Sequence, residues 1–541
     1  MCRFVYSEVV SISNFYKNYF DISVPYTHQI QVWKTIEKGK YPILLKAPTG
    51  SGKTEAVVSP FLSQFIENKF SIAPRLIYVL PMRVLVNSIA ARITGYAQKV
   101  SKNISVGIQH GESPNAPFFI DDIVVTTLDQ FIYGYARASN QVGHHLDIPA
   151  GAIASSLIVF DEAHMYRDGF TFSIMRAMFE ILHNANIPFV VMTATMPESL
   201  EKSLFENIKP EESQKVVSAG FNLDNQLDIS IEKEPIYKDN EVNISNALLD
   251  KIGNKKTLIV LNQVKRAQEV YKELKRQLDF GNDEIILLHS RFTVKDKKEH
   301  ENCAIKLLKN KKRGVIVSTQ VLEVGMDFSA DLLLTELAPA DSLVQRAGRC
   351  ARYKNEKGEI IIFPVEDGKG HLPYEKNHLE KTIGWLEKNK SFNIKDFSEV
   401  SKFVDILDYK ADDYAARDSL IDLYESVLYA DTRPQNIQVR EGKSVNLFMV
   451  DFAKGEGKKK EEIIRDAVMK TEYKENSITV DIKTAWGLIK KGIPLLEWDW
   501  SKEKSEKREK EVAIVPFKTY ILESSNYDSE IGVKNDESFI I

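Results

Sequence analysis

The chain has 541 residues and a formal charge of −4, from 72 Lys and Arg against 76 Asp and Glu. Apolar residues make up 43% of it and charged residues 27%, which is ordinary for globular proteins and excludes a disordered or fibrous chain. At roughly 150 residues per domain, the length predicts three to four domains. The small net charge argues against phosphate-binding side chains over the whole surface, although it is compatible with a local basic channel.

The sequence shows no sign of a membrane span or a secretory signal. No apolar stretch approaches the roughly 18–20 residues that a span needs, and the first residues, MCRFVYSEVV, lack a basic segment followed by an apolar one. We therefore expect a cytoplasmic protein with no membrane partner. The cysteines, Cys2, Cys303 and Cys350, form no CxxC pair, which argues against a zinc site and a disulfide framework.

Two stretches, 25–200 and 255–365, alternate short apolar runs with helix-length segments. Such runs are typical of parallel strands that are buried on both faces. We therefore predict an α/β fold with two tandem domains built on parallel sheets. The expected strands are, in chain order, 43–47, 76–80, 123–126, 157–160 and 189–192 in the first stretch, and 257–261, 285–288, 314–317, 332–334 and 360–363 in the second.

The segments outside these stretches are more polar. Residues 211–246 read as a connector with a few antiparallel strands, and the pattern after 385 predicts a mainly helical C-terminal domain of mixed charge. The charge run at 501–511 predicts a solvated loop or helix, with a nucleic-acid contact as the alternative. The expected domains are 1–215, 216–385 and 386–541.

Residues 47–54, APTGSGKT, follow an expected strand and precede a helical stretch, which is the context that a P-loop requires. Small residues let backbone N–H groups curl around phosphate oxygens, and the N-terminus of the next helix adds a positive dipole end. Lys53 would reach the β- and γ-phosphates, and the Thr54 hydroxyl would ligate Mg²⁺. Ala47 stands where the strict pattern has Gly. The small residues of the predicted phosphate site are Thr49, Gly50, Ser51 and Gly52.

The sequence Asp-Glu-Ala-His at 161–164 comes directly after the expected strand 157–160. A carboxylate at the C-terminal end of a parallel strand, beside a P-loop, can hold Mg²⁺. We therefore predict Asp161 as the metal residue. Glu162 is placed to orient and deprotonate the attacking water.

Gln29 lies ten residues before Gly39 in the segment YTHQIQVWKTIEKG. A Gln amide can pair with both the N6 donor and the N7 acceptor of adenine, so this residue favours ATP over GTP. The neighbouring Gln31 and a plain surface role for Gln29 are the alternatives.

The segment 345–352, QRAGRCAR, supplies arginines from the second domain. Arg349 and Arg352 are three residues apart, and we expect them on one face of a helix. Their guanidinium groups could reach the γ-phosphate when the domains close, as arginine fingers do, with rate effects of about 10³–10⁵ in other phosphoryl-transfer enzymes. The alternative is a helix with surface arginines.

Taken together, these motifs resemble a superfamily 2 helicase, a family that shares Ala at the first P-loop position and consists of two RecA-like domains. A narrower match, in LHSRF (288–292), QVLEVGMD (320–327) and DEAHMYRDGF (161–170), resembles the CRISPR-associated helicase of type I interference. The motifs, in order, are APTGSGKTE (47–55), LPMRVLVN (80–87), TTLDQF (126–131), DEAH (161–164), TAT (193–195), VSTQVLEVGMD (317–327) and QRAGRCAR (345–352).

The resemblance implies roles for individual residues. The nucleotide roles fall on Gln29, Lys53, Thr54, Asp161 and Glu162 in the first domain, and on Asp327, Arg349 and Arg352 in the second. Thr193 and Thr195 resemble the hydroxyls that couple hydrolysis to domain movement. Hydroxyls, amides and guanidiniums contact phosphates without reading sequence; a local cap or turn contact is the alternative for each. The residues implied in the nucleic-acid track are Arg83, Thr126, Thr127, Ser290, Arg291, Ser318, Thr319 and Gln320.

Many members of this family carry an N-terminal HD nuclease domain. Here the P-loop lysine is residue 53, and no His-Asp dipeptide occurs in the sequence. We therefore expect the split form, a helicase subunit that works with a separate HD nuclease subunit and a Cascade-type surveillance complex. The resemblance also implies ATP and Mg²⁺ as cofactors and 3′→5′ movement on single-stranded DNA. The C-terminal tryptophans, Trp486, Trp498 and Trp500, either stack on bases or belong to the core.

Three functions remain open from the sequence. The first is a CRISPR-associated DNA helicase. The second is another superfamily 2 motor, such as an RNA helicase. The third is a scaffold that binds nucleotide without turnover; the presence of Lys53, Glu162, Arg349 and Arg352 argues against it.

Overall fold

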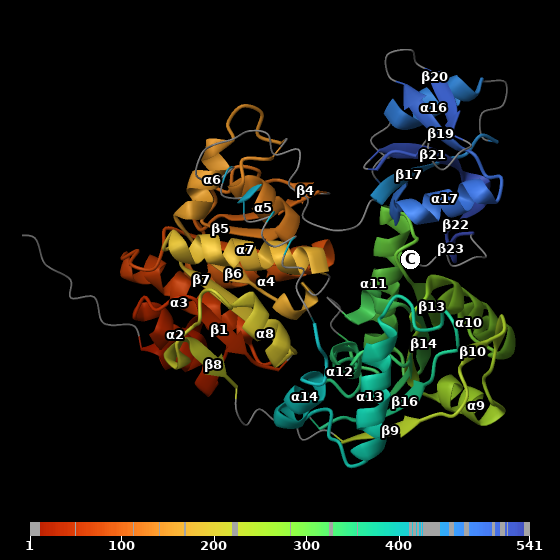
Figure 1. Cartoon of the computed structure of the whole chain (residues 1–541), viewed down its shortest axis with the longest axis horizontal. Coiled ribbons are helices and arrows are strands. Elements are labelled where there is room, and N and C mark those ends of the chain that lie inside the picture. Colours follow the sequence, from red (N-terminus) through yellow and green to blue (C-terminus); the bar gives the residue numbers. More distant parts are fainter. Residues whose placement is uncertain are drawn as a thin grey trace, which may run out of the picture. The chain divides into compact units, whose positions relative to one another are not determined.

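The computed structural model (Figure 1) divides the chain into two compact units. The first unit is Met1–Asn222 with Asp396–Glu441, and the second is Leu223–Lys395 with Gly442–Ile541. The residues after 395 are thus shared between the units, and the three-domain division expected from the sequence stays a prediction. The structure describes residues 11–534 except 49, 112, 140, 167–168, 219–225, 282, 324–327, 354, 410–413, 415–417, 419–420, 423–424, 426–443, 454–458, 470–474, 500–503, 509–513 and 517.

The first unit is built on an eight-stranded sheet with the order β4-β3-β5-β2-β6-β7-β1-β8. All of its pairs are parallel except that between β3 and β4. The five strands expected in this half are therefore confirmed. The strands are β1 (Ile43–Lys46), β2 (Arg75–Leu80), β3 (Val106–His110), β4 (Ser113–Pro114), β5 (Ile123–Thr127), β6 (Ser156–Phe160), β7 (Phe189–Thr193) and β8 (Lys215–Val217).

Helices cover this sheet, and every residue of β5, β6 and β7 is buried as a result. Parallel strands that are covered on both faces need continuous apolar runs, which is why these strands stand out in the sequence. The helices assigned to the first unit are α1 (Ile12–Phe20), α2 (Thr27–Glu37), α3 (Lys53–Glu67), α4 (Arg83–Val100), α5 (Leu128–Tyr135), α6 (Asp147–Ala154), α7 (Gly169–Asn184), α8 (Glu198–Leu204) and α14 (Phe397–Val404), with 3₁₀ turns η1 (Ala163–Met165) and η2 (Glu212–Gln214).

The second unit contains a six-stranded parallel sheet with the order β13-β14-β12-β15-β16-β9. The five strands expected in this half are confirmed, and β9 from the connector joins them at the edge. The strands are β9 (Gln226–Ile231), β12 (Lys256–Val260), β13 (Ile285–Leu288), β14 (Gly314–Ser318), β15 (Leu332–Glu336) and β16 (Lys357–Phe363). The helices are α9 (Asn246–Asn254), α10 (Val264–Gln277), α11 (Val294–Asn310), α12 (Ala340–Ala347) and α13 (Lys376–Lys388), with the 3₁₀ turn η3 (Gln320–Glu323).

The connector also holds the expected antiparallel pairing, in β10 (Tyr237–Lys238) and β11 (Glu241–Val242). Helices are present in the C-terminal region, as predicted. They accompany a five-stranded mixed sheet, β18-β17-β21-β19-β20, which the prediction did not include. The elements are β17 (Ser444–Val450), α16 (Lys460–Met469), β18 (Ser477–Asp481), α17 (Ile482–Lys490), β19 (Leu495–Asp499), β20 (Lys504–Arg508), β21 (Thr519–Glu523), η7 (Ser524–Asn526), β22 (Tyr527–Asp528) and β23 (Gly532–Val533).

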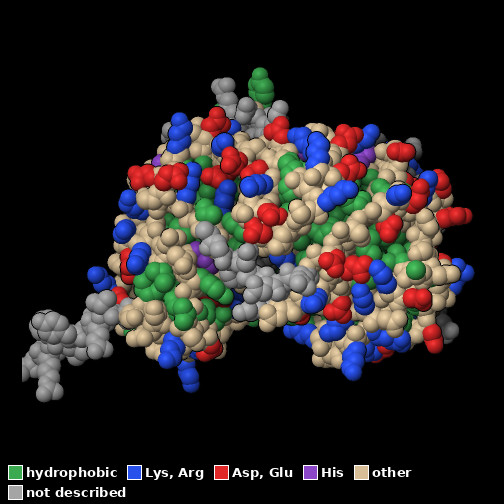
Figure 2. Space-filling view, turned by 90° about the horizontal axis from the view of Figure 1, so that it is seen from below, with side chains coloured by type: hydrophobic (Ala, Val, Ile, Leu, Met, Phe, Trp, Pro, Cys, Tyr) green, Lys and Arg blue, Asp and Glu red, His purple; other side chains and the backbone are tan. Residues whose placement is uncertain are grey.

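The surface carries both signs of charge. On the face shown in Figure 2, Lys and Arg side chains are interspersed with Asp and Glu, as the net charge of −4 leads us to expect. Within the described part of the chain, no helix is both long enough and apolar enough to cross a bilayer.

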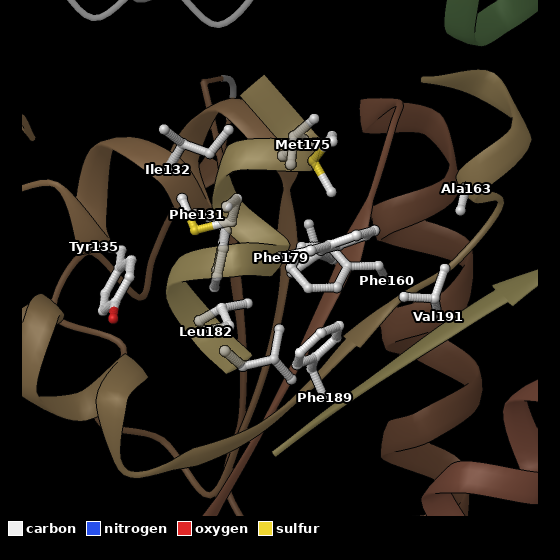
Figure 3. Close-up of a cluster of buried hydrophobic side chains, with 14 of the residues drawn as sticks. Phe131, Ile132, Tyr135, Phe160, Ala163, Met175, Phe179, Leu182, Phe189 and Val191 are labelled. Atoms are coloured by element: carbon white, nitrogen blue, oxygen red, sulfur yellow. The ribbon is translucent and has the colours of Figure 1, made fainter. Parts of the chain in front are cut away.

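Aromatic side chains from α7 and the sheet form the core of the first unit (Figure 3). The ring of Phe179 lies 5.1 Å from that of Phe160, 5.3 Å from that of Phe189 and 5.5 Å from that of Phe205, measured between centroids. This packing fixes α7 against β6 and β7. Because the acidic motif follows β6, the core also fixes the position of that motif.

Phe179→Ala should destabilise the first unit by about 3–5 kcal/mol, because it leaves a cavity among three aromatic rings. The measurement is hydrogen exchange of the β6 and β7 amides, which reports on this unit separately. Phe70→Ala, at a side chain that is 46% exposed, is the control and should cost at most about 1 kcal/mol. Equal destabilisation by the two substitutions would contradict the central place of Phe179 in the core.

Candidate nucleotide and nucleic-acid sites

The candidate phosphate loop between β1 and α3 has a left-handed backbone at two of its glycines. Gly50 and Gly52 adopt φ values of 81° and 78°, in the left-handed region. At Gly52 a Cβ would also lie 2.4 Å from Gln29 Nε2. The backbone conformation therefore favours glycine there, and a Cβ would also displace the Gln29 amide. Thr49, which the sequence assigns to the same loop, lies outside the described residues.

The side chains of Ser51 and Lys53 supply polar groups to this loop. The Lys53 ammonium donates to the carbonyls of Ala47 and Pro48, at 3.0 and 3.1 Å. The Ser51 hydroxyl is buried and finds no hydrogen-bond partner among the described residues. An unpaired buried hydroxyl costs about 1–3 kcal/mol, which an anionic oxygen in the loop would remove. The residues present therefore fit the polyphosphate of ATP.

A tyrosine joins the phosphate loop to the acidic motif. The Tyr78 hydroxyl donates to Asp161 Oδ2 at 2.6 Å and lies 3.1 Å from Thr54 Oγ1. The Arg92 guanidinium also donates to the Thr54 hydroxyl. Thr54 and Asp161, the two residues predicted to ligate Mg²⁺, are thus brought together on one side of the sheet.

The electrostatics of Asp161 also suit a cation. Burial, and then the neighbouring Glu162 carboxylate, raise the pKa of Asp161 to about 6. A divalent cation beside this carboxylate would stabilise its ionised form. Hydroxyl and carboxylate oxygens are the donors that Mg²⁺ takes in proteins, with substrate phosphates and water completing its shell. The donor set at Thr54 and Asp161 therefore fits Mg²⁺.

Glu162 is linked to the predicted coupling motif through a histidine. Its backbone is left-handed, with a φ of 53°, where the chain turns from β6 into η1. Glu162 Oε2 lies 3.5 Å from His164 Nδ1, and that nitrogen lies 3.2 Å from Thr193 Oγ1. Thr193 Oγ1 in turn accepts from the backbone N–H of Thr195 at 3.3 Å. The acidic motif and the Thr193–Thr195 motif therefore share one buried polar network.

Gln29 has a structural role in the described loop. Its Nε2 donates to the Gly52 carbonyl at 3.1 Å, and its Oε1 accepts from the Tyr26 N–H at 2.8 Å. One amide hydrogen and one lone pair are left for a base. The adenine contact stays a prediction. His28, beside it, lies 3.0 Å from the Ser51 carbonyl and was not singled out from the sequence.

The sequence reasoning also missed Tyr78 and Arg92. Arg92 lies 3.6 Å from Glu55 Oε1, a carboxylate that also accepts from the Tyr96 hydroxyl at 2.8 Å. The only signal for Tyr78 is a polar group within an apolar strand, RLIYVL. A buried tyrosine hydroxyl needs a partner, but its partners come from distant segments that no local pattern identifies.

Arg349 and Arg352 do not lie on a helix, so the prediction that they share one helix face is wrong. Helix α12 ends at Ala347, and Arg349 follows its C-terminal Gly348. The chain then turns at Ala351, with a φ of 44°, and its N–H donates to the Ala330 carbonyl at 3.0 Å. Arg349 Nε donates to the Leu322 carbonyl at 3.2 Å. Arg349 and Arg352 are therefore placed by a turn.

The arginine that does lie on α12 is structural. Arg346 is buried and donates to Thr335 Oγ1 at 2.8 Å and to Asn262 Oδ1 at 3.0 Å. Lys395, which is distant in sequence, contacts the C-terminal end of α12. Its Nζ donates to the carbonyls of Ala347 and Cys350, at 3.1 and 2.8 Å. Burial lowers the pKa of Lys395 to about 8. These contacts hold the turn that carries both candidate arginine fingers.

The predicted nucleic-acid residues fall into two groups. The hydroxyls of Thr126 and Ser318 donate to the carbonyls of Gln109 and Leu288, at 2.9 and 2.8 Å, so they hold the strand ends. In these two cases the hydroxyls make the local contacts that the sequence left as the alternative. Gln320 Nε2 likewise donates to the Asn262 carbonyl at 3.0 Å.

Other predicted contacts remain accessible or unsatisfied. Arg83 and Ser290 are exposed. The buried Thr127 hydroxyl and Arg291 Nη1 find no hydrogen-bond partner in the described parts of the chain. Thr319 is buried, with its N–H donating to the Leu288 carbonyl at 3.2 Å. These residues keep polar groups that a phosphate backbone could use.

The remaining predicted residues divide between core positions and undescribed segments. Trp486 packs against the cluster around Leu447 and Leu488, and Trp498 packs against the cluster around Phe448. Their half-buried packing supports the core reading. Asp327 and Trp500 lie outside the described residues.

Tyr78→Phe should raise the Mg²⁺ concentration for half-maximal ATP hydrolysis about tenfold, because the hydroxyl that orients Asp161 is lost. Tyr41→Phe is the matched control, since the buried Tyr41 hydroxyl makes no hydrogen bond within the described residues. A magnesium titration of steady-state hydrolysis compares the two. The same Mg²⁺ requirement in both variants would contradict the positioning role.

Comparison with known proteins places these motifs in a family. A DEAD/DEAH box helicase model matches residues 26–203. A model for the C-terminal part of the CRISPR-associated nuclease/helicase Cas3 matches residues 253–355. The first match spans β1 to β7 of the eight-stranded sheet, and the second spans β12 to β15 of the six-stranded sheet.

Two relatives are similar over most of this chain. The CRISPR-associated helicase Cas3 of Thermoproteus tenax is 31% identical over 377 residues, 66% of this chain and 62% of the relative. A putative CRISPR-associated nuclease/helicase Cas3 of Methanocaldococcus jannaschii is 32% identical over 422 residues, 70% of this chain and 54% of the relative. The matches thus cover less than two thirds of the length of either relative.

Solved structures support the fold. A crystal structure of T. fusca Cas3 has a TM-score of 0.68 at 19% identity, and covers 95% of this chain and 69% of that one. The helicase MrfA bound to DNA has a TM-score of 0.61 at 17% identity, covering 95% and 69%. The chain therefore contains a DEAD/DEAH box helicase domain in its first unit. Its second unit contains a segment similar to the C-terminal part of Cas3, and the fold resembles that of the Cas3 structure.

Proposed function

We propose that this chain is an ATP-dependent helicase that moves 3′→5′ on single-stranded DNA, in the cytoplasm, as part of type I CRISPR interference. The observation that carries the proposal is the bridge from Thr54 through Tyr78 to Asp161. It brings the phosphate loop and the acidic motif into the relation that nucleotide hydrolysis needs. The choice of single-stranded DNA as the nucleic acid rests on the resemblance to the Cas3 helicases.

In the proposed reaction, the Lys53 ammonium leaves its carbonyl contacts to bind the β- and γ-phosphates. Thr54 and Asp161 would hold Mg²⁺, which neutralises charge that develops on the phosphate oxygens. Glu162 orients a water and accepts its proton. Arg349 and Arg352 are proposed to stabilise the transferring phosphoryl group from the second unit.

Glu162 is also the start of the proposed coupling path. Any change in its charge or position on hydrolysis reaches Thr193 through His164, because the three side chains are in one network. Helix α8 begins at Glu198, shortly after that motif. Its Glu198 N–H donates to Asp405 at 2.9 Å, and the Ser199 hydroxyl donates to the Leu407 carbonyl at 3.1 Å. The segment that follows α14 therefore contacts the start of the helix that comes after the proposed coupling motif.

The proposed partners follow from the family. A chain of similar fold occurs in a CRISPR RNA-guided surveillance complex in its pre-nicking state, with a TM-score of 0.58 at 17% identity. We propose that this chain also works with such a complex. We also propose a separate HD nuclease subunit as a partner of this chain.

An RNA motor is the second candidate. The ATP-dependent RNA helicase DBP8 of Meyerozyma guilliermondii is 26% identical over 358 residues, which cover 63% of this chain and 78% of that protein. The candidate contacts in both units would bind phosphates, which RNA and DNA share. Measurements with each nucleic acid are therefore needed to decide between RNA and DNA.

Lys53→Ala should reduce ATP hydrolysis at least about a hundredfold, because the phosphates lose their only charge partner in the loop. Lys38→Ala, at an exposed lysine just after α2, is the control and should keep the wild-type rate. Steady-state hydrolysis under saturating DNA measures both. Retained turnover in Lys53→Ala would contradict the phosphate assignment.

Single-stranded DNA should stimulate hydrolysis by the wild-type chain more strongly than duplex DNA or single-stranded RNA does. The measurement is the hydrolysis rate with each nucleic acid at matched nucleotide concentration. Stimulation mainly by RNA would support the RNA motor in place of the DNA helicase. The same rate with and without every nucleic acid would contradict both.

A further inference from the structure

The hairpin of β22 and β23 holds the loop that carries Arg291. His289 Nε2 donates to the Ile531 carbonyl at 3.0 Å, and the Val533 N–H donates to the Arg291 carbonyl at 3.1 Å. On the far side of Arg291, the Thr293 N–H donates to the Tyr527 hydroxyl at 3.1 Å. The hairpin therefore fixes the backbone before, at and after Arg291.

The hairpin is itself fixed to the helicase domain of the second unit. Gln268 Nε2, on α10, donates to the Ile531 carbonyl at 2.6 Å. The Tyr271 hydroxyl and the Lys275 ammonium of the same helix both contact the Glu530 carboxylate. Because these groups come from successive turns of one helix, the hairpin has a defined place on α10.

Gly532 shows how closely the hairpin and the loop approach. Its φ is 80°, and a Cβ there would lie 2.5 Å from the Arg291 carbonyl oxygen and 2.7 Å from His289 Cε1. His289 is stacked on Phe292, with ring centroids 4.3 Å apart. No larger residue than glycine fits between the hairpin and the loop without moving one of them.

The low pKa of His289 keeps its ring neutral near neutral pH. Burial lowers the pKa of His289 to about 3. Its Nδ1 accepts from the Arg291 N–H at 3.1 Å, so the single ring hydrogen is on Nε2 and points at Ile531. The hydrogen bond from the loop to the hairpin therefore does not depend on protonation in the physiological range.

Arg291 is a buried cation, and no ion pair joins it to a carboxylate among the described residues. Its side chain is 9% exposed, and its Nη1 has no hydrogen-bond partner among the residues that the structure describes. Burial lowers the pKa of Arg291 to about 10, so it stays charged at neutral pH. A buried charged group with an unsatisfied donor is unfavourable, and an oxyanion from outside the chain would accept from Nη1.

We propose that the 527–533 hairpin is a positioning element that aims the Arg291 guanidinium at a backbone phosphate of the bound nucleic acid. The hairpin follows β21 of the C-terminal sheet through η7. The C-terminal sheet and a phosphate contact of the helicase domain are thereby connected. This inference rests on the proposed function, because it takes nucleic acid as the ligand.

The experiment compares two glycine substitutions. Gly532→Ala places a methyl group against the Arg291 loop. Gly492→Ala is the matched control, because its φ is 77° but no heavy atom lies within 4 Å of the added Cβ. Both variants therefore carry the same kind of backbone strain, and only the first collides with the loop.

Binding of fluorescent single-stranded DNA and RNA is measured for each variant over a range of salt concentrations. We expect Gly532→Ala and Arg291→Ala to weaken binding about tenfold. Both should also lower the magnitude of the slope of log K against log salt by about 0.7, the value for one phosphate contact to a single strand. Gly492→Ala should match the wild type. The double variant Gly532→Ala/Arg291→Ala should be no weaker than Arg291→Ala, since both lose one contact.

The outcomes separate the inference from the proposed function. Wild-type protein that binds neither nucleic acid would overturn both. Wild-type binding with an unchanged slope in Gly532→Ala, beside a reduced slope in Arg291→Ala, would overturn the hairpin's role alone. An unchanged slope in Arg291→Ala would overturn the phosphate contact.

A second variant covers the case in which Gly532→Ala does not fold. Tyr527→Phe adds no atom and removes the hydroxyl that accepts from Thr293 and donates to Asp296. It should weaken binding about threefold and lower the salt slope in the same direction. Wild-type affinity and slope in Tyr527→Phe would contradict the inference.

Discussion

The hydroxyl of Tyr78 is the contact on which the candidate nucleotide site depends. It stands between the Thr54 hydroxyl and the Asp161 carboxylate, which belong to segments far apart in the chain. Both are buried, so neither can rely on water for orientation. The aromatic core around Phe179 fixes β6 from the other side of the sheet. The oxygens proposed as cation ligands are therefore held in place by packing and by the Tyr78 hydroxyl.

Both units use the same device of placing polar groups at the ends of buried parallel strands. In the first unit, Asp161 and Thr193 stand at the ends of β6 and β7. In the second, Ser318 ends β14 and Glu336 ends β15, where Glu336 pairs with Arg266 at 2.7 Å. Some of these groups face a prospective ligand, whereas others satisfy the protein's own backbone. A group's burial and its hydrogen-bond partners, and not its residue type, show whether it faces a prospective ligand or bonds to the protein's own backbone.

The sequence predicts the strands of the two tandem domains and the place of the glycine-containing loop between β1 and α3, because both are local patterns. Apolar runs identify buried strands, and APTGSGKT identifies a loop. Prediction from the sequence fails where the conformation depends on a single residue or on a contact with a distant segment. Gly348 ends α12 before Arg349, so spacing alone misplaced the arginines. The C-terminal sheet was not predicted because its strands alternate in burial, as in β17 and β18, and lie among charged segments. Tyr78 and the hairpin act through partners that no local pattern contains.

The path of the chain limits how the protein can be divided. The polypeptide passes between the two units at residues 222–223, 395–396 and 441–442. A fragment that ends at residue 222 would lack α14, whose Val400, Phe403 and Val404 are buried. No single cut yields two complete units. Isolating the first unit by expression therefore requires residues 396–441 to be joined directly behind residue 222, which makes a rearranged polypeptide and not a truncation.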